Sequence, residues 1–169
     1  MGMHWFLSLL ILKNFKCLNI TVIYENKQDI VSWFDTWKFN RPVFFTGVLS
    51  DRLGYAIDDD DERIRNNNKH FLNELHRLVF KKSKKKIVRL VIIEKGKGRK
   101  HCHMLLDIPE HLSCNLFNDL IEQSWLKTKG GIGTNIKEVF NLNGIQQYLV
   151  KEIYPNKEML GVDIQNSYQ

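Results

Sequence analysis

The alternation of apolar and polar residues predicts strands and amphipathic helices in the central part of the chain. Runs rich in β-branched and aromatic residues are typical of strands. Apolar residues three or four positions apart are typical of helices. The predicted strands are 43–49, 87–93, 100–108 and 135–140, and the predicted helices are about 58–81, about 111–127 and 143 to just before Pro155. This order predicts an α+β domain with an antiparallel central sheet and helices packed on one face.

The chain before Pro42 does not follow this regular order. Residues 1–40 are predicted to be an N-terminal extension, in which Ile30, Phe34 and Trp37 form an apolar stripe that packs on the main domain. Residues 41–155 are predicted to be that domain, and residues 156–169 a C-terminal tail. The longest apolar run, residues 5–12, is far shorter than the roughly 20 residues of a membrane span, so no membrane partner is expected.

Charge is concentrated in one segment of this 169-residue chain, whose formal net charge is +6. Residues 81–100 contain ten basic side chains and one acid, and the rest of the chain is slightly acidic. A basic stripe of this kind is typical of proteins that bind nucleic acid. A solvated lysine-rich loop and a nuclear-targeting run are the alternatives. The three cysteines lack a CxxC spacing, which predicts reduced thiols in a cytoplasm-like compartment.

Candidate metal ligands lie on the predicted hairpin formed by 87–93 and 100–108. Side chains alternate across a strand, so His101 and His103 are predicted side by side on the open face of the sheet, while Cys102 faces the helices. If Glu94 pairs with His101, its carboxylate lies on the histidine face. Two imidazoles and a carboxylate with open positions suit Mg²⁺ or Mn²⁺. The alternatives are two surface histidines and an acid that relieves repulsion among the loop lysines.

A candidate nucleophile lies on the last predicted helix. At 100° per residue, Ile145 and Leu149 fall on the buried arc, and Tyr148, Lys151 and Glu152 occupy the arc beside it. A phenol is a poor nucleophile at its ordinary pKa of about 10, and a nearby ammonium or metal-bound phosphate stabilises the phenolate. The alternative is a half-buried structural tyrosine.

Three separated motifs carry a resemblance to a known family. Glu94-Lys-Gly followed by His101-Cys-His-Met-Leu-Leu resembles the metal motif of the HUH endonucleases. Residues 147–152, Gln-Tyr-Leu-Val-Lys-Glu, are similar to the tyrosine motif of single-tyrosine replication initiators (Rep proteins) of phage, plasmid and parvovirus type. Residues 43–48 resemble the first, strand-forming motif of that family. The likeness covers about 41–155 in the family's order and implies its ferredoxin-like (RRM-like) HUH nuclease fold.

The resemblance also implies a reaction. Tyr148 would attack a DNA phosphodiester to leave a 5′-phosphotyrosyl link and a free 3′-OH, and Lys151 would orient the phosphate. This is the reaction of a nickase that initiates rolling-circle replication. The ion would be Mn²⁺ or Mg²⁺, held by His101, His103 and a carboxylate. Glu94 and Glu152 compete for the carboxylate position or share it.

The expected substrate is single-stranded DNA or an origin hairpin. Phosphates are expected to contact the hairpin tip, and bases to contact Phe45 and Thr46 on the sheet, although Thr46-Gly-Val lacks the second threonine often seen in the first motif. The chain has no P-loop motif, so a helicase of the host or the element would act in trans. The compartment would be the cytoplasm of a bacterial host or phage-infected cell. The tip residues are Lys95, Lys97, Arg99 and Lys100.

Two other functions fit the same residues. A single-tyrosine transposase of the same superfamily uses the same chemistry, and a domain-swapped dimer in which Tyr148 completes its partner's site would favour it. A single-stranded nucleic-acid-binding module would use the basic hairpin without cutting. The sequence leaves the oligomeric state open.

Overall fold

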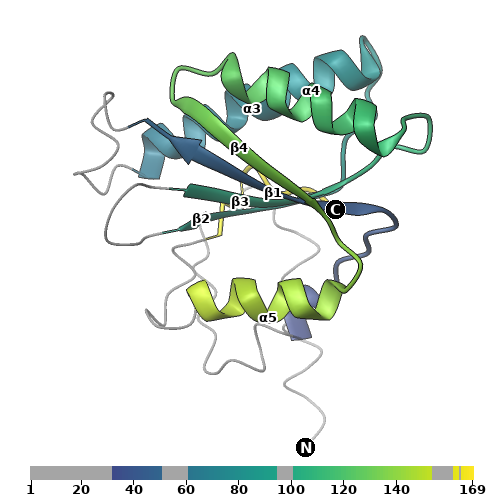
Figure 1. Ribbon diagram of the computed structural model, residues 1–169, viewed down its shortest axis with the longest axis vertical. Helices are drawn as coiled ribbons and strands as arrows, with labels where there is room; N and C mark the ends of the chain where they lie inside the picture. The colour runs from purple at the N-terminus through teal and green to yellow at the C-terminus, as the bar shows by residue number, and fades with distance from the viewer. Residues whose placement is uncertain (1–31, 51–60, 95–100, 154–161, 164) are drawn as a thin grey trace, which may run out of the picture.

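The computed structural model describes residues 32–50, 61–94, 101–153, 162–163 and 165–169 of the chain. For residues 61, 94, 146 and 150–153 this description covers the backbone only. The elements within these ranges follow the predicted order (Figure 1). They are β1 (Pro42–Leu49), α3 (Asp61–Phe80), β2 (Arg89–Glu94), β3 (His101–Asp107), α4 (Cys114–Leu126), β4 (Gly131–Glu138) and α5 (Leu142–Ile153).

The strands form one antiparallel sheet in the order β2-β3-β1-β4. The α+β class and the antiparallel sheet are therefore confirmed. The predicted hairpin register is also confirmed, since Glu94 pairs with His101 and Ile92 with His103. Directly paired residues of antiparallel strands occupy the same face, so positions 94, 101 and 103 share one face of the sheet.

Helices cover both faces of the sheet, so the prediction that they pack on one face is wrong. In Figure 1, α3 and α4 lie on one side of the strands and α5 on the other. Leu149 of α5 is buried with Phe44, Leu90 and Leu105 in a cluster that is separate from the core under α3 and α4. The physical reason is that β1, β2 and β3 carry large apolar side chains on both faces. An uncovered second face would expose these side chains to water.

The core under α3 and α4 is built around three aromatic rings. The ring centroids of Phe45, Phe71 and Trp125 lie 5.2–5.4 Å apart in stacked and edge-on arrangements. Cys102 and Met104 of β3 are buried in the same core, which confirms the predicted face for alternate residues of this strand. Ser113 caps α4 because its side-chain oxygen accepts a hydrogen bond from the backbone N–H of Leu116.

The core on the α5 side includes part of the segment before β1. Phe34 is buried in this core, and Trp33, Trp37 and Phe39 are partly buried against it. The predicted packing of the 30–37 stripe is confirmed for Phe34 and Trp37, and Ile30 lies outside the described residues. Together with α5, this segment shields Phe44 and Leu90 from water.

Strand β4 begins at Gly131, four residues before the predicted start. The glycine-rich sequence at 130–133 predicts a break, and the structure instead continues the strand through it. Gly131 is needed because Trp125 lies very close to the sheet: a Cβ at this position would collide with the backbone oxygen of Trp125. A glycine in a strand often marks such a close approach.

The segment that comprises 162, 163 and 165–169, here called the closing segment, lies along the outer edge of β2. Val162 and Tyr168 form antiparallel bridges with Ile92 and Arg89. Asp163 is fully buried and accepts hydrogen bonds from the side-chain amides of Asn68 and Asn166 and from Arg65. Burial raises the pKa of the Asp163 carboxyl, and these hydrogen bonds act against that shift. The edge strand is thus paired on its outer side.

None of the helices in the described ranges combines the length and the apolar character needed to span a membrane.

The close approach of Trp125 to β1 leads to a stability prediction. A Cβ on Gly47 would lie 2.5 Å from Cζ2 of Trp125, and this buried ring is held by Phe45 and Phe71. Gly47→Ala is therefore expected to lower the free energy of unfolding by at least about 1–3 kcal/mol, the usual cost of overpacking. The measurement is denaturant unfolding of the variant beside wild type.

Gly133→Ala is the matched control for this prediction. The nearest atoms to a Cβ at Gly133 belong to Val48 and lie 3.8 Å away, so this variant is expected to unfold within about 0.5 kcal/mol of wild type. Equal losses of stability in the two variants would contradict the proposed role of Trp125.

Candidate functional site

The candidate site lies on the sheet face covered by α5, at the end of the β2–β3 hairpin. Pairing across the strands sets out its positions in rows. His101 pairs with Glu94 on β2 and with Val48 on β1, and His103 pairs with Ile92 and Thr46. Two rows of the sheet thus bring one carboxylate position, two imidazoles and a threonine hydroxyl to the same face.

His103 is buried and fixed by two neighbours. It is only 3% exposed, and its Nδ1 lies 3.0 Å from the Thr46 hydroxyl oxygen. Its ring is stacked on Phe44 at a centroid distance of 5.4 Å and an interplanar angle of 11°. The prediction that both histidines lie on an open face is therefore wrong for His103, because α5 covers the part of the sheet where His103 lies. His101, one pair nearer the hairpin end, is partly exposed.

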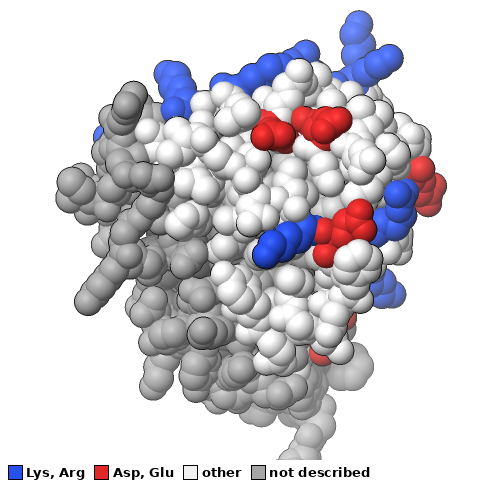
Figure 2. All heavy atoms as spheres, in the orientation of Figure 1, with Lys and Arg blue, Asp and Glu red and all other residues white. Residues whose placement is uncertain are grey.

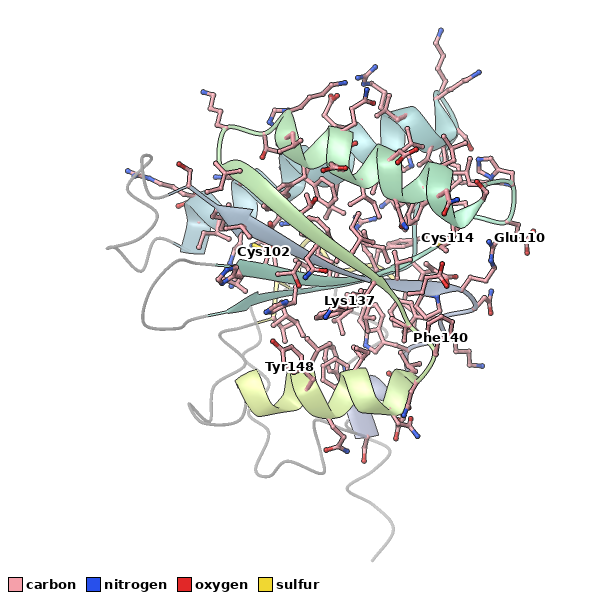
Figure 3. All side chains as sticks on the ribbon, in the orientation of Figure 1. Cys102, Glu110, Cys114, Lys137, Phe140 and Tyr148 are labelled. Carbon is pink, nitrogen blue, oxygen red and sulfur yellow. The ribbon has the colours of Figure 1, made fainter. Side chains whose placement is uncertain are left out.

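Tyr148 projects from α5 toward the sheet (Figure 3) and contacts the ring of His103. The two ring centroids lie 5.8 Å apart, and the rings are nearly perpendicular. Tyr148 makes a similar edge-on contact with Phe44 at 6.0 Å. Edge-to-face contacts of this kind stabilise a defined ring orientation. Tyr148 is nevertheless 43% exposed, so its ring is anchored while part of it contacts solvent.

The helical pattern predicted for α5 is confirmed where side chains are described. Leu149 is 1% exposed and Ile145 is partly buried against the sheet. The side chains of Lys151 and Glu152 lie outside the described residues, so their roles stay predictions. The structure therefore brings together Tyr148, His103, Thr46 and Phe44, and it gives the backbone position of Glu94.

The residues at this site offer imidazole nitrogens and a carboxylate position, which are common ligands of divalent metal ions. Metal-ligating histidines commonly use one ring nitrogen for the metal and the other for a hydrogen bond that fixes the ring. His103 shows the second half of that arrangement, because Nδ1 is engaged by Thr46. A metal would accordingly bind His103 through Nε2, with His101 and a carboxylate as further ligands. Among the residues whose side chains are described, no group of three His, Cys, Asp or Glu residues could hold a metal, and Glu94 and Glu152 are not among them.

The prediction that Phe45 contacts DNA bases is wrong. Phe45 is 0% exposed and lies in the core with Phe71 and Trp125, on the face opposite the histidines. The reason is the alternation of side chains on β1: Thr46 pairs with His103, whereas Phe45 pairs with Met104. Phe44 shares the histidine face, and it is 8% exposed because His103 and Tyr148 contact its ring.

The basic stripe is not uniform in the structure. Lys95, Lys97, Arg99 and Lys100 lie outside the described residues. Arg89 is partly buried, and its guanidinium donates hydrogen bonds to the backbone oxygens of Asn166 and Ile87. Burial lowers the pKa of this guanidinium. Arg89 therefore holds the closing segment. Among the described residues of the stripe, the five lysines within 81–86 are the exposed ones.

Two polar residues on β4 were missed by sequence reasoning. Asn135 pairs with Thr46 and Lys137 pairs with Phe44, so both positions extend the histidine face across the sheet, and both side chains are exposed. Figure 3 labels Lys137 on this strand. Alternation along β4 would have revealed them if the strand had been predicted to pair with β1. Asn135 adds an amide and Lys137 an ammonium group to the face that carries Thr46, Phe44 and His103.

Cys102, between the two histidines in sequence, takes no part in the site. It is fully buried in the opposite core, and burial raises the pKa of its thiol far above the ordinary value. The thiolate is the reactive form of cysteine, so Cys102 is a packing residue.

Comparison of the chain with protein-family models, with curated proteins and with solved structures finds no match in any of the three.

The contact between Thr46 and His103 leads to a spectroscopic prediction. Thr46→Val keeps the shape of the side chain and removes the hydroxyl that engages Nδ1. The ¹⁵N NMR signal of His103 Nδ1 is then expected to shift, because this nitrogen loses its hydrogen bond with the Thr46 hydroxyl. Thr46→Ser keeps the hydroxyl and is expected to preserve the wild-type spectrum. An unchanged spectrum in the valine variant would show that Thr46 does not fix the ring.

Proposed function

We propose that the protein is a metal-dependent, single-tyrosine DNA endonuclease that nicks and rejoins single-stranded DNA and initiates rolling-circle replication. One observation carries the proposal. Tyr148 of α5 lies against His103 of β3, so a candidate nucleophile and a candidate metal ligand from separate sequence motifs share one site. A structural tyrosine needs no such neighbour, and the resemblance to the HUH endonucleases pairs these two motifs in one reaction.

The proposed step is an in-line transfer of a phosphoryl group. The phenolate oxygen of Tyr148 attacks the phosphorus of a phosphodiester, and a bond forms between that oxygen and phosphorus. The bond between phosphorus and the 3′ oxygen breaks, and the leaving 3′ oxygen takes up a proton. The phenol releases its own proton to solvent, which reaches Tyr148 because 43% of the residue is exposed. Attack by a 3′-OH on the phosphotyrosine reverses the step and rejoins the strand.

A bound Mn²⁺ or Mg²⁺ would polarise a phosphate oxygen as a Lewis acid. The residues that would hold it are His101, His103 and a carboxylate from Glu94 or Glu152. Phe44 and His103 keep the Tyr148 ring in place before substrate arrives, which reduces the entropy lost on reaching the reactive geometry. Lys151, one turn along α5, would stabilise the negative charge on the phosphate.

The placement of Tyr148 favours a replication initiator over a transposase of the same superfamily. In the transposase alternative, the tyrosine completes the site of a partner subunit. Here Tyr148 contacts His103 and Phe44 of its own chain, so no exchange of α5 is needed to assemble the pair. The proposed partners are single-stranded DNA or an origin hairpin and a helicase of the host or the element.

Removal of the Tyr148 hydroxyl tests the nucleophile. Tyr148→Phe keeps the ring that contacts Phe44 and His103, so stability is expected to fall by at most about 1.5 kcal/mol, the net value of one hydrogen bond. Formation of an SDS-resistant adduct with a labelled single-stranded oligonucleotide in Mn²⁺ is expected to disappear. The measurement is gel electrophoresis under denaturing conditions.

Tyr168→Phe is the matched control, because Tyr168 is 39% exposed and lies beside Lys86 at the edge of β2. This control is expected to form the adduct at the wild-type level. Adduct that persists in Tyr148→Phe would place the nucleophile elsewhere. Wild type is tested with Mn²⁺ and with Mg²⁺, and with its natural origin sequence as substrate. If it binds DNA and forms no adduct under any of these conditions, the binding-module alternative replaces the proposal.

Loss of a histidine tests the metal. His101→Ala and His103→Ala are each expected to reduce nicking by more than about 100-fold, since even residues behind metal ligands cost about 10–100-fold when changed. His70→Ala, an exposed position on α3, is expected to nick at the wild-type rate. EDTA is expected to abolish nicking and added Mn²⁺ to restore it in wild type. Nicking that continues in EDTA would rule out the metal-dependent reaction.

A further inference from the structure

Five lysines gather in the connection between α3 and β2, away from the candidate site. Lys81, Lys82, Lys84, Lys85 and Lys86, here called the lysine loop, are all exposed. No ion pair joins any of them to a carboxylate in the described part of the chain. The proposed reaction at Tyr148 does not use them. Within the described residues, their charge therefore faces solvent.

The backbone of the lysine loop is held by hydrogen bonds within the protein. Lys81 takes a left-handed conformation with φ of 53° and donates its N–H to the Arg77 oxygen, which ends α3. The Lys85 N–H donates to the Ser83 hydroxyl, and the His76 ring contacts the Lys85 oxygen. Ordered like charges repel one another, and release of the counterions that they attract favours binding of a polyanion.

The lysine loop and the candidate site lie at opposite ends of β2. The loop leads into Arg89, and the carboxylate position Glu94 ends the strand. At about 3.4 Å per residue these two ends are about 17 Å apart. Figure 1 shows the connection from α3 entering the sheet at the end away from the β2–β3 hairpin turn. Figure 2 shows Lys and Arg side chains along the upper rim of the view, over the α3 and α4 layer.

We propose that the lysine loop is a second DNA site, which binds the phosphates of a duplex that flanks the single-stranded segment at Tyr148. The inference rests on the proposed function in taking DNA as the substrate. Single-stranded sites combine cations with aromatic rings on which bases stack. Tyr168, an aromatic ring beside the loop, already has Lys86 at 4.7 Å and Arg89 at 5.7 Å from its centroid. Residues 81–86 themselves contain no aromatic ring, and contacts from cations alone are those made to the phosphates of a duplex backbone.

The distance along β2 sets the length of duplex that is needed. A duplex rises about 3.4 Å per base pair, so a span of about 17 Å corresponds to about five base pairs. A flank shorter than this does not reach the lysine loop from the site. A flank of about twelve base pairs covers the loop with several phosphates.

The experiment compares two variants of equal charge with wild type. The loop variant replaces Lys81, Lys82, Lys84 and Lys85 with Gln and keeps Lys86 beside Tyr168. The control variant replaces four lysines that are exposed elsewhere, Lys38, Lys69, Lys127 and Lys129, with Gln. Affinity is measured against salt concentration for one single-stranded oligonucleotide alone, with a three-base-pair flank and with a twelve-base-pair flank. Adduct formation on the single strand alone is measured separately.

We expect the twelve-base-pair flank to raise the affinity of wild type and of the control variant, and the three-base-pair flank to raise neither. The loop variant is expected to lose this gain, and its salt slope on the long flank to flatten by up to about 3.6, at about 0.9 per duplex phosphate contact. Its adduct yield on the single strand is expected to match wild type. This pattern would support the second site even if Tyr148 proves inactive, because the gain from the flank is a binding measurement.

Three results would overturn the proposal. Equal losses in the loop and control variants would indicate an effect of net charge alone. A loss on the single strand as large as on the flanked substrate would make the loop part of the single-stranded site. Unchanged DNA binding by the loop variant, together with loss of binding to vesicles of anionic phospholipid, would assign the lysines to a membrane surface.

Discussion

The alternation of side chains on β1 and β3 determines the arrangement of the whole molecule. Neighbouring residues on each strand point to opposite faces, so Phe45 and Cys102 enter one core while Thr46 and His103 enter the other. Because both sets contain large apolar neighbours, each face needs its own covering of helices. The chemistry of the site is a consequence of this arrangement: the polar residues that could react lie where α5 meets the sheet, and α5 carries the tyrosine.

Burial decides how a substrate reaches these residues. His103 is enclosed by Phe44, Thr46 and Tyr148, whereas His101 and Tyr148 are accessible in part. In the proposed reaction, a phosphodiester would therefore approach from the side of His101 and meet the exposed part of the Tyr148 ring. The proposed site thus has a buried end, where Phe44 and Thr46 hold the His103 ring, and an exposed end at His101, where a substrate would enter.

Local patterns in the sequence were sufficient for most elements and for the hairpin register. The order of the elements and the pairing of Glu94 with His101 depend on neighbouring residues. The structure has this pairing as predicted and most elements within a few residues of their predicted bounds. The side of the sheet on which α5 packs depends on residues far away in the chain. The periodicity of α5 shows which of its side chains are apolar, but it does not show which face of the sheet they contact. Alternation along β1 places Phe45 on the face of Met104 and Thr46 on the face of His103, so Phe45 belongs to the core and not to the site. The early start of β4 and the pairing of the closing segment depend on Trp125 and on the buried Asp163, which no local pattern reveals.

The pairing of the closing segment with β2 has a consequence for the order of folding. The closing segment meets β2 through isolated bridges at Arg89 and Ile92 and a hydrogen bond from the Val91 N–H to the Ser167 hydroxyl. These contacts need β2 to be in place already, so the segment is expected to dock after the sheet has formed. Until then β2 is an open sheet edge whose residues, from Leu90 to Ile93, are all of the buried type. The species most prone to self-association is thus an almost complete fold that lacks its last pairing, and its lifetime is set by the rate at which that one segment docks.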